Sequence, residues 1–441
     1  MGWGNGWYGR LAQGGDWDDK PYPVVLRGTS SGDPFLGPGT LVPGAAHIFI
    51  LGDDGVLTTH GKCHFGQLGH GMLDEDKEVP TPLSLPTPPS AVYAGESSGF
   101  AVSNGGKGPV YAWGCGFFHG LGIENEDHAL SPVRVDTEWD FVGDEHPPIV
   151  QIVGGGSHIL IRREDGSLAS GGGNQWGQTG HPGPGQEGGA ESFIPKILPL
   201  PEGIRDMDAG RRNTLLLGVS GTVYVYGDPK TGVVDAPVLT PEDAFEGETI
   251  LQVAMGPKHA LAASDSAVFA WGVGAHGRLG LGSSDSVSSP TRVVFDPPFT
   301  GSIVRIAAGS SHSVMLTSTN EVWSWGSAVR GKQLFLSLAK EVNSRELDDP
   351  LANSPDSCVQ APVKLDLDAF EFDAVLDIAA GTNHTLLTVS GDVSVAIKAQ
   401  ESGKSALRAQ IEGIQARLKA EDKARRAAWA ANPPPPPPPL P

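Results

Sequence analysis

Cysteine is scarce in this chain, and long apolar runs are missing. Three cysteines, Cys63, Cys115 and Cys358, lie far apart among 441 residues. This scattered, odd-numbered set excludes a disulfide framework and the paired spacing of a structural zinc site, so we expect a reducing compartment. No stretch approaches the roughly 18 apolar residues of a membrane helix, and the first residues lack the apolar segment of a signal peptide. We therefore expect no membrane association and an intracellular protein, cytoplasmic, nuclear or both.

Basic residues are also few. The chain has 31 Lys and Arg residues against 51 Asp and Glu residues, which gives a formal net charge of −20. Affinity for nucleic acid comes largely from Lys and Arg side chains that neutralise phosphates, so direct nucleic-acid binding is not expected. A strongly acidic chain is better suited to meet basic patches on other proteins.

Catalytic motifs are lacking as well. The sequence contains no metalloprotease helix motif and no kinase-like set. Gly403-Lys404-Ser405 resembles the end of a phosphate-binding loop, but Lys398 stands where the first glycine of that motif belongs. We expect no catalytic residue, no metal and no cofactor, and therefore a protein that is not an enzyme.

Glycine and proline, in contrast, are abundant, with 61 and 37 residues. This composition favours many turns and short strands over long helices. Gly272, Gly274 and Gly277 have the G-x-G-x-x-G spacing of a dinucleotide-binding turn. The residues that follow, 278–290, are rich in glycine and serine and end in proline, so they cannot begin the helix that such a site needs. The spacing also recurs along the chain, which indicates an architecture and not a single site.

Two short motifs alternate along the chain. The first is Trp-Gly followed by a glycine-rich loop, with clear copies at Trp3-Gly4, Trp113-Gly114, Trp271-Gly272 and Trp325-Gly326. The second is Gly-x-x-His, whose histidines are His47, His158, His259, His312 and His384, while Ser98 and Asn213 take the histidine's place in two copies. These seven copies recur about every fifty residues. Each unit also contains runs of β-branched and aromatic residues separated by turns, which predicts four short strands per unit.

Seven units of four strands predict an all-β, seven-bladed β-propeller. Glycines at the narrow end of each blade would allow neighbouring chains to approach and the backbone to adopt positive φ. The tryptophan before the glycine would supply area for packing between blades. The five histidines could suggest a metal or catalytic site, but one histidine per blade spreads them around the ring. We interpret them as structural groups that form hydrogen bonds inside the blades.

The combined pattern resembles the repeat of the regulator of chromosome condensation family. It consists of Trp-Gly, Gly-x-Leu-Gly, a proline and Ile-Ala-Ala-Gly-x-x-His, and it covers residues 1 to about 397. The resemblance implies a ring closed by pairing of the two chain ends, with residues 393–397 as the last strand. Two units depart from the pattern, because residues 226–230 lack the Gly-x-Leu-Gly loop and an insertion occupies about 335–358.

The C-terminal part has a different composition. We expect the propeller to span residues 1–400 and a basic helical tail to span 401–432, with Leu407, Ile411, Ile414 and Leu418 on one coiled-coil-like seam. Residues 433–441 form a polyproline segment. Pro433–Pro439 is either a ligand for an SH3, WW or profilin-type reader or an inert end.

Acidic clusters are the candidate partner-binding residues. They are Asp16, Asp18 and Asp19, then Asp74, Glu75 and Asp76, then Glu124, Glu126 and Asp127, with a further group at 138–140. Most follow a Trp-Gly or Leu-Gly loop, so we expect them to share one rim of the ring. They are either ordinary solvated loops or a surface that receives a basic partner.

The function predicted from these features is a non-enzymatic protein-interaction scaffold or regulatory adaptor that uses one propeller face. The family resemblance implies an alternative, guanine-nucleotide exchange on a Ran-like small GTPase. It also implies a third, an adaptor in tRNA or translation-factor modification or in microtubule-linked processes. Residues 1–30 hold only Arg10, Lys20 and Arg27, so the basic arm expected for chromatin docking is missing. We also expect no appended ligase or lipid-binding domain.

Overall fold

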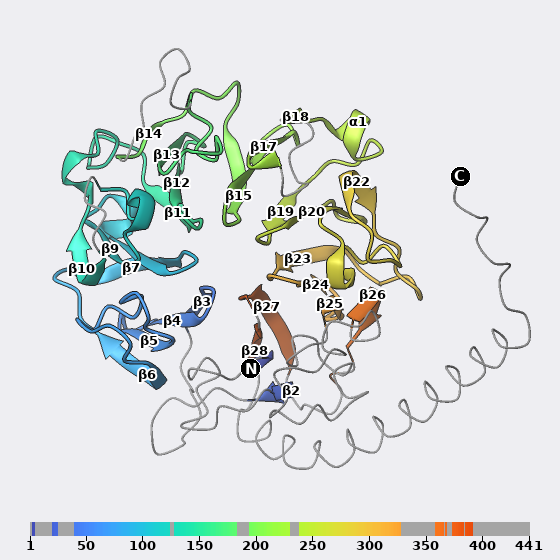
Figure 1. Ribbon diagram of the computed structural model, residues 1–441, viewed down its shortest axis with the longest axis horizontal. Helices are drawn as coiled ribbons and strands as arrows, with labels where there is room; N and C mark the ends of the chain where they lie inside the picture. The colour runs from blue at the N-terminus through green and yellow to red at the C-terminus, as the bar shows by residue number, and fades with distance from the viewer. Residues whose placement is uncertain are drawn as a thin grey trace, which may run out of the picture.

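The computed structural model describes residues 2–4, 20–24, 39–123, 128–182, 194–229, 238–327, 358–365, 367, 373–382 and 384–390. Their strands form seven sheets of four antiparallel strands each. Figure 1 shows these sheets arranged around a common axis, with β3, β7, β11, β15, β19, β23 and β27 innermost. The all-β prediction is therefore confirmed. The expected last strand at 393–397, most of the insertion and the tail lie outside the described residues.

The first three sheets along the chain follow one connection pattern. One sheet contains β3 (Gly39–Pro43), β4 (His47–Gly52), β5 (Leu57–Gly61) and β6 (Lys77–Leu83). The next contains β7 (Pro89–Ala94), β8 (Ser98–Ser103), β9 (Val110–Gly114) and β10 (Ala129–Arg134). The third contains β11 (Ile149–Gly154), β12 (His158–Arg163), β13 (Leu168–Gly172) and β14 (Lys196–Ile197).

The next three sheets repeat this pattern. One contains β15 (Ile204–Ala209), β16 (Asn213–Gly218), β17 (Val223–Gly227) and β18 (Val238–Leu239). Another contains β19 (Gln252–Met255), β20 (His259–Ala263), β21 (Val268–Gly272) and β22 (Val287–Arg292). The sixth contains β23 (Ile303–Ala308), β24 (His312–Thr317), β25 (Val322–Ser327) and β26 (Cys358–Lys364).

The seventh sheet combines strands from both ends of the sequence. Its order is β2 (Lys20–Val24), β1 (Gly2–Gly4), β28 (His384–Ser390) and β27 (Ala374–Ala380). Gly2 pairs with Leu386 and Gly4 pairs with His384 in antiparallel register. The Trp-Gly segment at the start of the sequence therefore lies in a strand, as the Trp-Gly segments of β9, β21 and β25 do.

The few helical segments lie in connections between strands. They are α1 (Pro241–Ala244) and the 3-10 turns η2 (Asn104–Gly106), η3 (Phe117–His119), η4 (Asp136–Glu138) and η6 (Ala275–Gly277). In the described part of the chain, no helix combines the length and apolar character that crossing a membrane requires.

The second strand of each sheet is buried on both faces because it lies between two neighbouring sheets. Every residue of β8, β16, β20 and β24 is buried. Their near-continuous apolar sequences fit this position, since a strand covered on both sides needs no polar face. The innermost strands instead alternate between buried and accessible positions, as in β11 and β15. The pattern of buried residues therefore distinguishes the second strand of a sheet from its innermost strand.

The hydrophobic core is divided among the seams between sheets. One cluster joins Phe100 and Val102 of β8 to Ile159 and Ile161 of β12. Another joins Leu215 of β16 to residues of β20 and β21. Each sheet therefore buries its apolar side chains against the next sheet and not within itself, so a single unit has no core of its own.

The repeated tryptophans cover glycines of the preceding sheet. Trp113, Trp271 and Trp325 are completely buried. A methyl group added at Gly69 would lie 3.1 Å from the Trp113 ring, and one at Gly280 would lie 2.8 Å from the Trp325 ring. The last glycine of Gly-x-Leu-Gly thus leaves room for the neighbour's indole.

The sheet of β11–β14 has Gly171 where other units have tryptophan, and a different tryptophan compensates. This is Trp139, from the connection between β10 and β11, which is 5% exposed. Its ring would lie 3.1 Å from a methyl group added at Gly122. Its Nε1 donates to the Gly122 carbonyl oxygen at 3.2 Å. The sequence interpretation grouped residues 138–140 with the acidic rim. Within this group, Trp139 packs in the seam between two sheets.

We predict that Trp139→Ala lowers the free energy of unfolding by about 3–5 kcal/mol, because it leaves a large cavity in a seam. Urea unfolding followed by intrinsic fluorescence measures this change. Phe117→Ala is the matched control: the residue is 52% exposed, so we expect a change below about 0.5 kcal/mol. Equal effects of the two substitutions would contradict the assignment of Trp139 to the seam.

Candidate protein-interaction face

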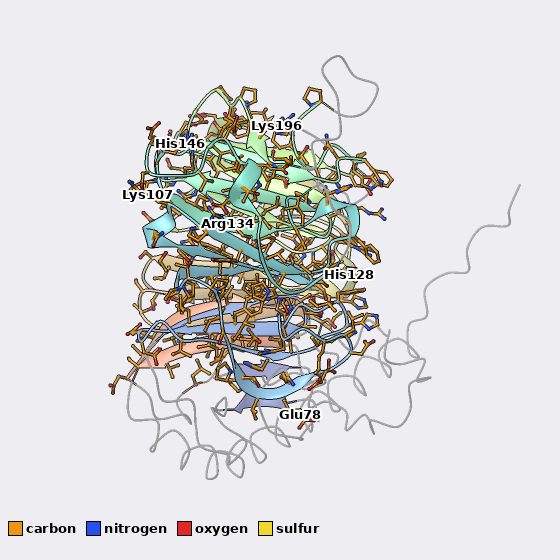
Figure 2. All side chains as sticks on the ribbon, turned by 90° about the vertical axis from the view of Figure 1, so that its left-hand side faces the viewer. Glu78, Lys107, His128, Arg134, His146 and Lys196 are labelled. Atoms are coloured by element: carbon orange, nitrogen blue, oxygen red, sulfur yellow. The ribbon has the colours of Figure 1, made fainter. Side chains whose placement is uncertain are left out.

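The two faces of the molecule are built from different connections. The turns between the first and second strands, together with the loops after the third strands, form one face, which we call the loop face. The turns between the second and third strands form the opposite face, which we call the hairpin face. Figure 2 shows the separation, with His128 at the loop face and Lys107 and His146 at the hairpin face.

Each Gly-x-x-His segment is a tight two-residue turn on the loop face. The Gly155 N–H donates to the His158 carbonyl oxygen at 2.8 Å, and the same bond joins Gly309 to His312 at 2.9 Å. The imidazole folds back over the glycine, so that a methyl group added at Gly155 would lie 2.2 Å from Cε1 of His158. The spacing of glycine and histidine therefore follows from steric contact, because a Cβ at the glycine would displace the ring.

The buried histidines also connect neighbouring sheets. His158 Nε2 lies 2.8 Å from Thr214 Oγ1, and that hydroxyl donates to the Gln178 carbonyl oxygen at 2.6 Å. Nε2 must therefore donate, which fixes a neutral tautomer. His259 makes the equivalent contact with Ser313 Oγ at 2.9 Å. Burial lowers the pKa of His158 to about 4 and holds the pKa of His259 well below its usual range, with the charge of Arg278 as a smaller second cause for His259.

The other repeat histidines occupy the same position. His312 Nε2 lies 3.0 Å from Thr385 Oγ1, and His47 Nε2 lies 3.3 Å from the Ser98 carbonyl oxygen. His384 is buried, and its ring lies against Gly381. Within the described ranges, no three His, Cys, Asp or Glu side chains gather as a metal site requires.

We predict that part of the stability is lost on acidification through His158. Its folded pKa of about 4 lies below the unfolded value of roughly 6.5. The contribution is therefore complete above pH 6.5 and declines as the pH falls toward 4. His158→Asn introduces a non-titrating side chain that this chain already buries in the same position of another repeat, at Asn213.

Urea unfolding at pH 7 and pH 5 tests this prediction. The wild type should lose about 2 kcal/mol more than His158→Asn between these pH values. Identical losses for the two proteins would show that His158 does not titrate in this range.

An aromatic patch is exposed on the loop face. Phe65, Phe117 and His128 lie together, with ring centroids 5.3 Å apart for Phe65 and His128 and 4.5 Å apart for Phe117 and His128. Phe117 is 52% exposed. Met72 and Leu73, from the same loop as Phe65, are 51% and 49% exposed. We call these five residues the aromatic patch. Large apolar side chains gathered at a surface are typical of interaction sites.

The sequence interpretation missed the aromatic patch. Its members lie in the glycine-rich loops that were interpreted only as repeat structure, and residues 65 and 117 do not occupy the same position of the repeat. The available signal is the presence of bulky aromatic residues beside glycine in loops that are otherwise small and polar. Their proximity depends on packing between two adjacent sheets, which the linear pattern does not contain.

The acidic candidates that the structure describes lie beside the aromatic patch. Asp74 pairs with His64, and Glu75 pairs with Lys77. Asp76 Oδ1 accepts the Cys63 N–H at 2.7 Å, so this carboxylate supports its own loop. Asp74 and Glu75 therefore remain candidates for partner contact, while Asp76 has a local structural role. The other candidate acids, Asp16, Asp18, Asp19, Glu124, Glu126 and Asp127, lie outside the described residues.

Several carboxylates on the hairpin face are used internally. Glu202 accepts from the backbone N–H and hydroxyl of Ser220, at 2.7 Å each, and from the Tyr224 hydroxyl at 2.9 Å. Glu321 binds Lys364 and Thr300, and these hydrogen bonds outweigh burial and lower its pKa to about 2. Such carboxylates stabilise turns and leave fewer acceptors for a partner.

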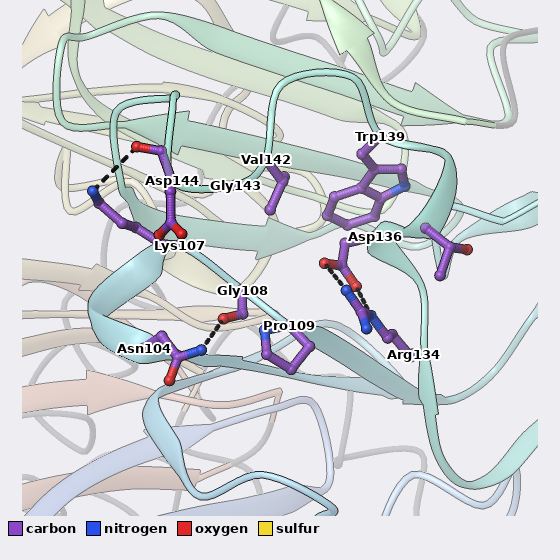
Figure 3. Close-up of a pocket in the computed structure, with 11 residues that line it drawn as sticks. Asn104, Lys107, Gly108, Pro109, Arg134, Asp136, Trp139, Val142, Gly143 and Asp144 are labelled. Atoms are coloured by element: carbon purple, nitrogen blue, oxygen red, sulfur yellow. Dashed lines mark hydrogen bonds and ion pairs between the residues drawn. The ribbon is translucent and has the colours of Figure 1, made fainter.

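A cleft of about 560 Å³ opens beside η2 and η4. Figure 3 shows that Arg134 pairs with Asp136 and that Lys107 reaches the backbone of Asp144. Arg134 donates from Nε to Asp136 at 2.8 Å, and Lys107 Nζ donates to the Asp144 carbonyl oxygen at 3.3 Å. The lining includes Thr137 but no serine, cysteine or histidine.

The fold and the repeated turns define a class, the repeat proteins built of radially arranged four-stranded antiparallel sheets. Family models described as "Regulator of chromosome condensation (RCC1) repeat" match residues 107–161 and 265–316, and a second model of the same description matches 303–331. The chain is an RCC1-type repeat protein.

Curated relatives agree with this assignment. The ultraviolet-B receptor UVR8 of Arabidopsis thaliana is 27% identical over 348 residues, which cover 75% of this chain and 73% of the receptor. The mitochondrial RCC1 domain-containing protein RUG3 of the same plant is 29% identical over 353 residues, which cover 76% and 73%. The secretion-regulating guanine nucleotide exchange factor of Bos taurus is 28% identical over 253 residues, which cover 54% and 53%.

Solved structures show the same fold. Human WBSCR16 superposes with a TM-score of 0.67 at 19% identity, over 88% of this chain and 99% of that one. Prp20p of Saccharomyces cerevisiae superposes with a TM-score of 0.63 at 18% identity, over 91% and 94%. At these identities the likeness extends to the fold alone.

Proposed function

We propose that this protein is a non-enzymatic interaction scaffold, a closed seven-bladed propeller that binds a protein partner on its loop face. Closure is supported by the pairing of β1 with β28 and by the Thr382 N–H, which donates to the Ala45 carbonyl oxygen at 3.2 Å between the last and first turns. A closed ring has no open sheet edges and presents its loops as one rigid surface.

The aromatic patch carries this proposal. Phe117, Met72 and Leu73 are each about half exposed although they are large and apolar. Burial of such side chains by a partner removes apolar surface from water. This contributes roughly 25 cal/mol of favourable free energy per Å². Aromatic residues and methionine are also enriched at the centres of protein interfaces. The neighbouring Asp74 and Glu75 would supply a polar, acidic rim.

Guanine-nucleotide exchange on a Ran-like small GTPase is the second candidate. It is favoured by two matches, the bovine exchange factor and a 31% identical stretch of 122 residues in the mouse regulator of chromosome condensation. The structure of Prp20p is described together with its binding to Gsp1p and histones. Exchange would use acidic side chains such as Asp74 and Glu75 against the nucleotide site. No observation on the described residues favours the translation-factor or microtubule alternative.

We expect Phe65→Ala combined with Phe117→Ala to abolish capture of the physiological partner from cell extract, because the aromatic patch loses its largest rings. Quantitative mass spectrometry of material bound to the tagged protein measures the loss. Val219→Ala is the control, since Val219 is 62% exposed in a turn of the hairpin face, and it should leave capture unchanged. A chain ending at Gln400 tests whether the tail contributes. Unchanged capture by the double variant would overturn the loop-face assignment.

We expect the scaffold to leave nucleotide release from a purified Ran-type GTPase unchanged. The GTPase is loaded with fluorescent GDP, and its release is followed with and without a catalytic amount of this protein. An acceleration of about tenfold or more that is lost in Asp74→Asn combined with Glu75→Gln would establish exchange instead. Glu202→Gln on the hairpin face is the control for the charge change.

A further inference from the structure

The loop face has a second feature, a group of cations in a chain whose net charge is −20. Arg211 and Arg212 lie in the turn between β15 and β16, Lys258 lies in the turn between β19 and β20, and Arg278 follows η6. We call these four residues the basic cluster. They come from consecutive sheets, so they share one side of the ring.

The turns that carry the basic cluster are in direct contact. A methyl group added at Gly210 would lie 2.7 Å from the Gly256 carbonyl oxygen, and one at Gly256 would lie 2.3 Å from the Gly309 carbonyl oxygen. Arg278 joins the same row, because its Nη1 donates to the Ser310 carbonyl oxygen at 2.9 Å. The basic cluster therefore follows a continuous row of turns around the mouth of the central axis.

Carboxylates within the protein neutralise only part of this charge. Arg212 pairs with Asp228 at 3.3 Å and stacks on Trp176, with its guanidinium carbon 4.9 Å from the ring centroid. Arg211 Nε lies 4.0 Å from Glu96 Oε1. Burial raises the pKa of Glu96, and the charge of Arg211 offsets part of this rise. The exposed side chain of Lys258 has no carboxylate within 4.0 Å among the described residues.

Arg278 is the most unusual member of the basic cluster. It is 6% exposed, and its Nε and Nη1 donate to carbonyl oxygens of Ala275 and Ser310 at 2.8 and 2.9 Å. No carboxylate lies within 4.0 Å of it in the part of the chain that the structure describes. Backbone carbonyl oxygens therefore hold this buried guanidinium, and its positive charge adds to that of the exposed cations on the same face.

We propose that the basic cluster binds an acidic segment of a protein partner, with its carboxylates placed along the row of turns. The proposal rests on the proposed function, since it names the chemistry of a partner on the same face. Arginine binds carboxylates with paired hydrogen bonds, so exposed arginines in this row suit a carboxylate-rich ligand.

An acidic peptide fits better than a nucleic acid. A polyanionic nucleic acid needs many phosphate contacts along its length, and the basic cluster offers four cations. Asp74, Glu75 and the net charge of −20 would repel a long polyanion, whereas a short acidic segment can occupy the cluster alone.

Fluorescence anisotropy with a labelled Glu-rich peptide tests the proposal. Its counterpart with Gln in place of Glu is the ligand control. Arg211→Glu combined with Lys258→Glu should raise the Kd for the Glu-rich peptide at least about tenfold, because both exposed cations change sign. Lys107→Glu combined with Arg205→Glu reverses the same number of charges at exposed positions away from the basic cluster, and it should change the Kd less than about twofold. Binding should weaken between low salt and about 0.3 M NaCl.

Three outcomes would overturn the proposal. They are equal binding of the Gln peptide, equal weakening by both double variants, and tighter binding of an oligonucleotide of matched charge that depends on Arg211 and Lys258. Phe65→Ala with Phe117→Ala should leave peptide affinity unchanged. If this variant retains both peptide binding and partner capture, the proposed role of the aromatic patch fails while the acidic-segment site stands.

Discussion

The seam between neighbouring sheets depends on the contact between a histidine ring and the glycine three residues before it. The glycine gives the imidazole space to lie over its own turn, and the ring then reaches a hydroxyl of the next sheet, as His158 reaches Thr214 and His259 reaches Ser313. Because the same hydroxyls donate to backbone carbonyls, each ring is held in one neutral tautomer. This contact sets the spacing between adjacent turns and thereby the continuous rim of the loop face.

This geometry also explains why the two faces differ. On the hairpin face, acidic side chains such as Glu202 and Glu321 are acceptors for the N–H and hydroxyl groups of their own turns. On the loop face, the tight turns that begin with glycine and end with histidine or asparagine form the rim, and the two residues inside them differ from one repeat to the next. Arg211, Arg212 and Lys258 occupy those variable positions, and the aromatic patch occupies the loops outside them.

The aromatic patch and the basic cluster lie on different sheets of the same face. The aromatic patch comes from the sheets of β3–β6 and β7–β10, and the basic cluster comes from those of β15–β22. A partner that contacts both would be apolar where it meets Phe117 and acidic where it meets Lys258. Such a division by charge and hydrophobicity orients a ligand on a ring whose backbone is nearly the same in every unit.

The sequence by itself determined the repeat, the four strands in each unit and the all-β class, because glycine spacing and β-branched runs are local signals. It also indicated that the histidines are structural. Only the tertiary structure decided what each residue faces. Trp139, which follows an acidic residue in sequence, fills a seam because the next sheet has Gly171 where a tryptophan is expected. Phe65 and Phe117 meet, and Lys258 follows Arg211 along the rim, because radial packing brings together residues about fifty positions apart. These contacts involve side chains that do not recur from unit to unit, so they leave no periodic mark in a single sequence.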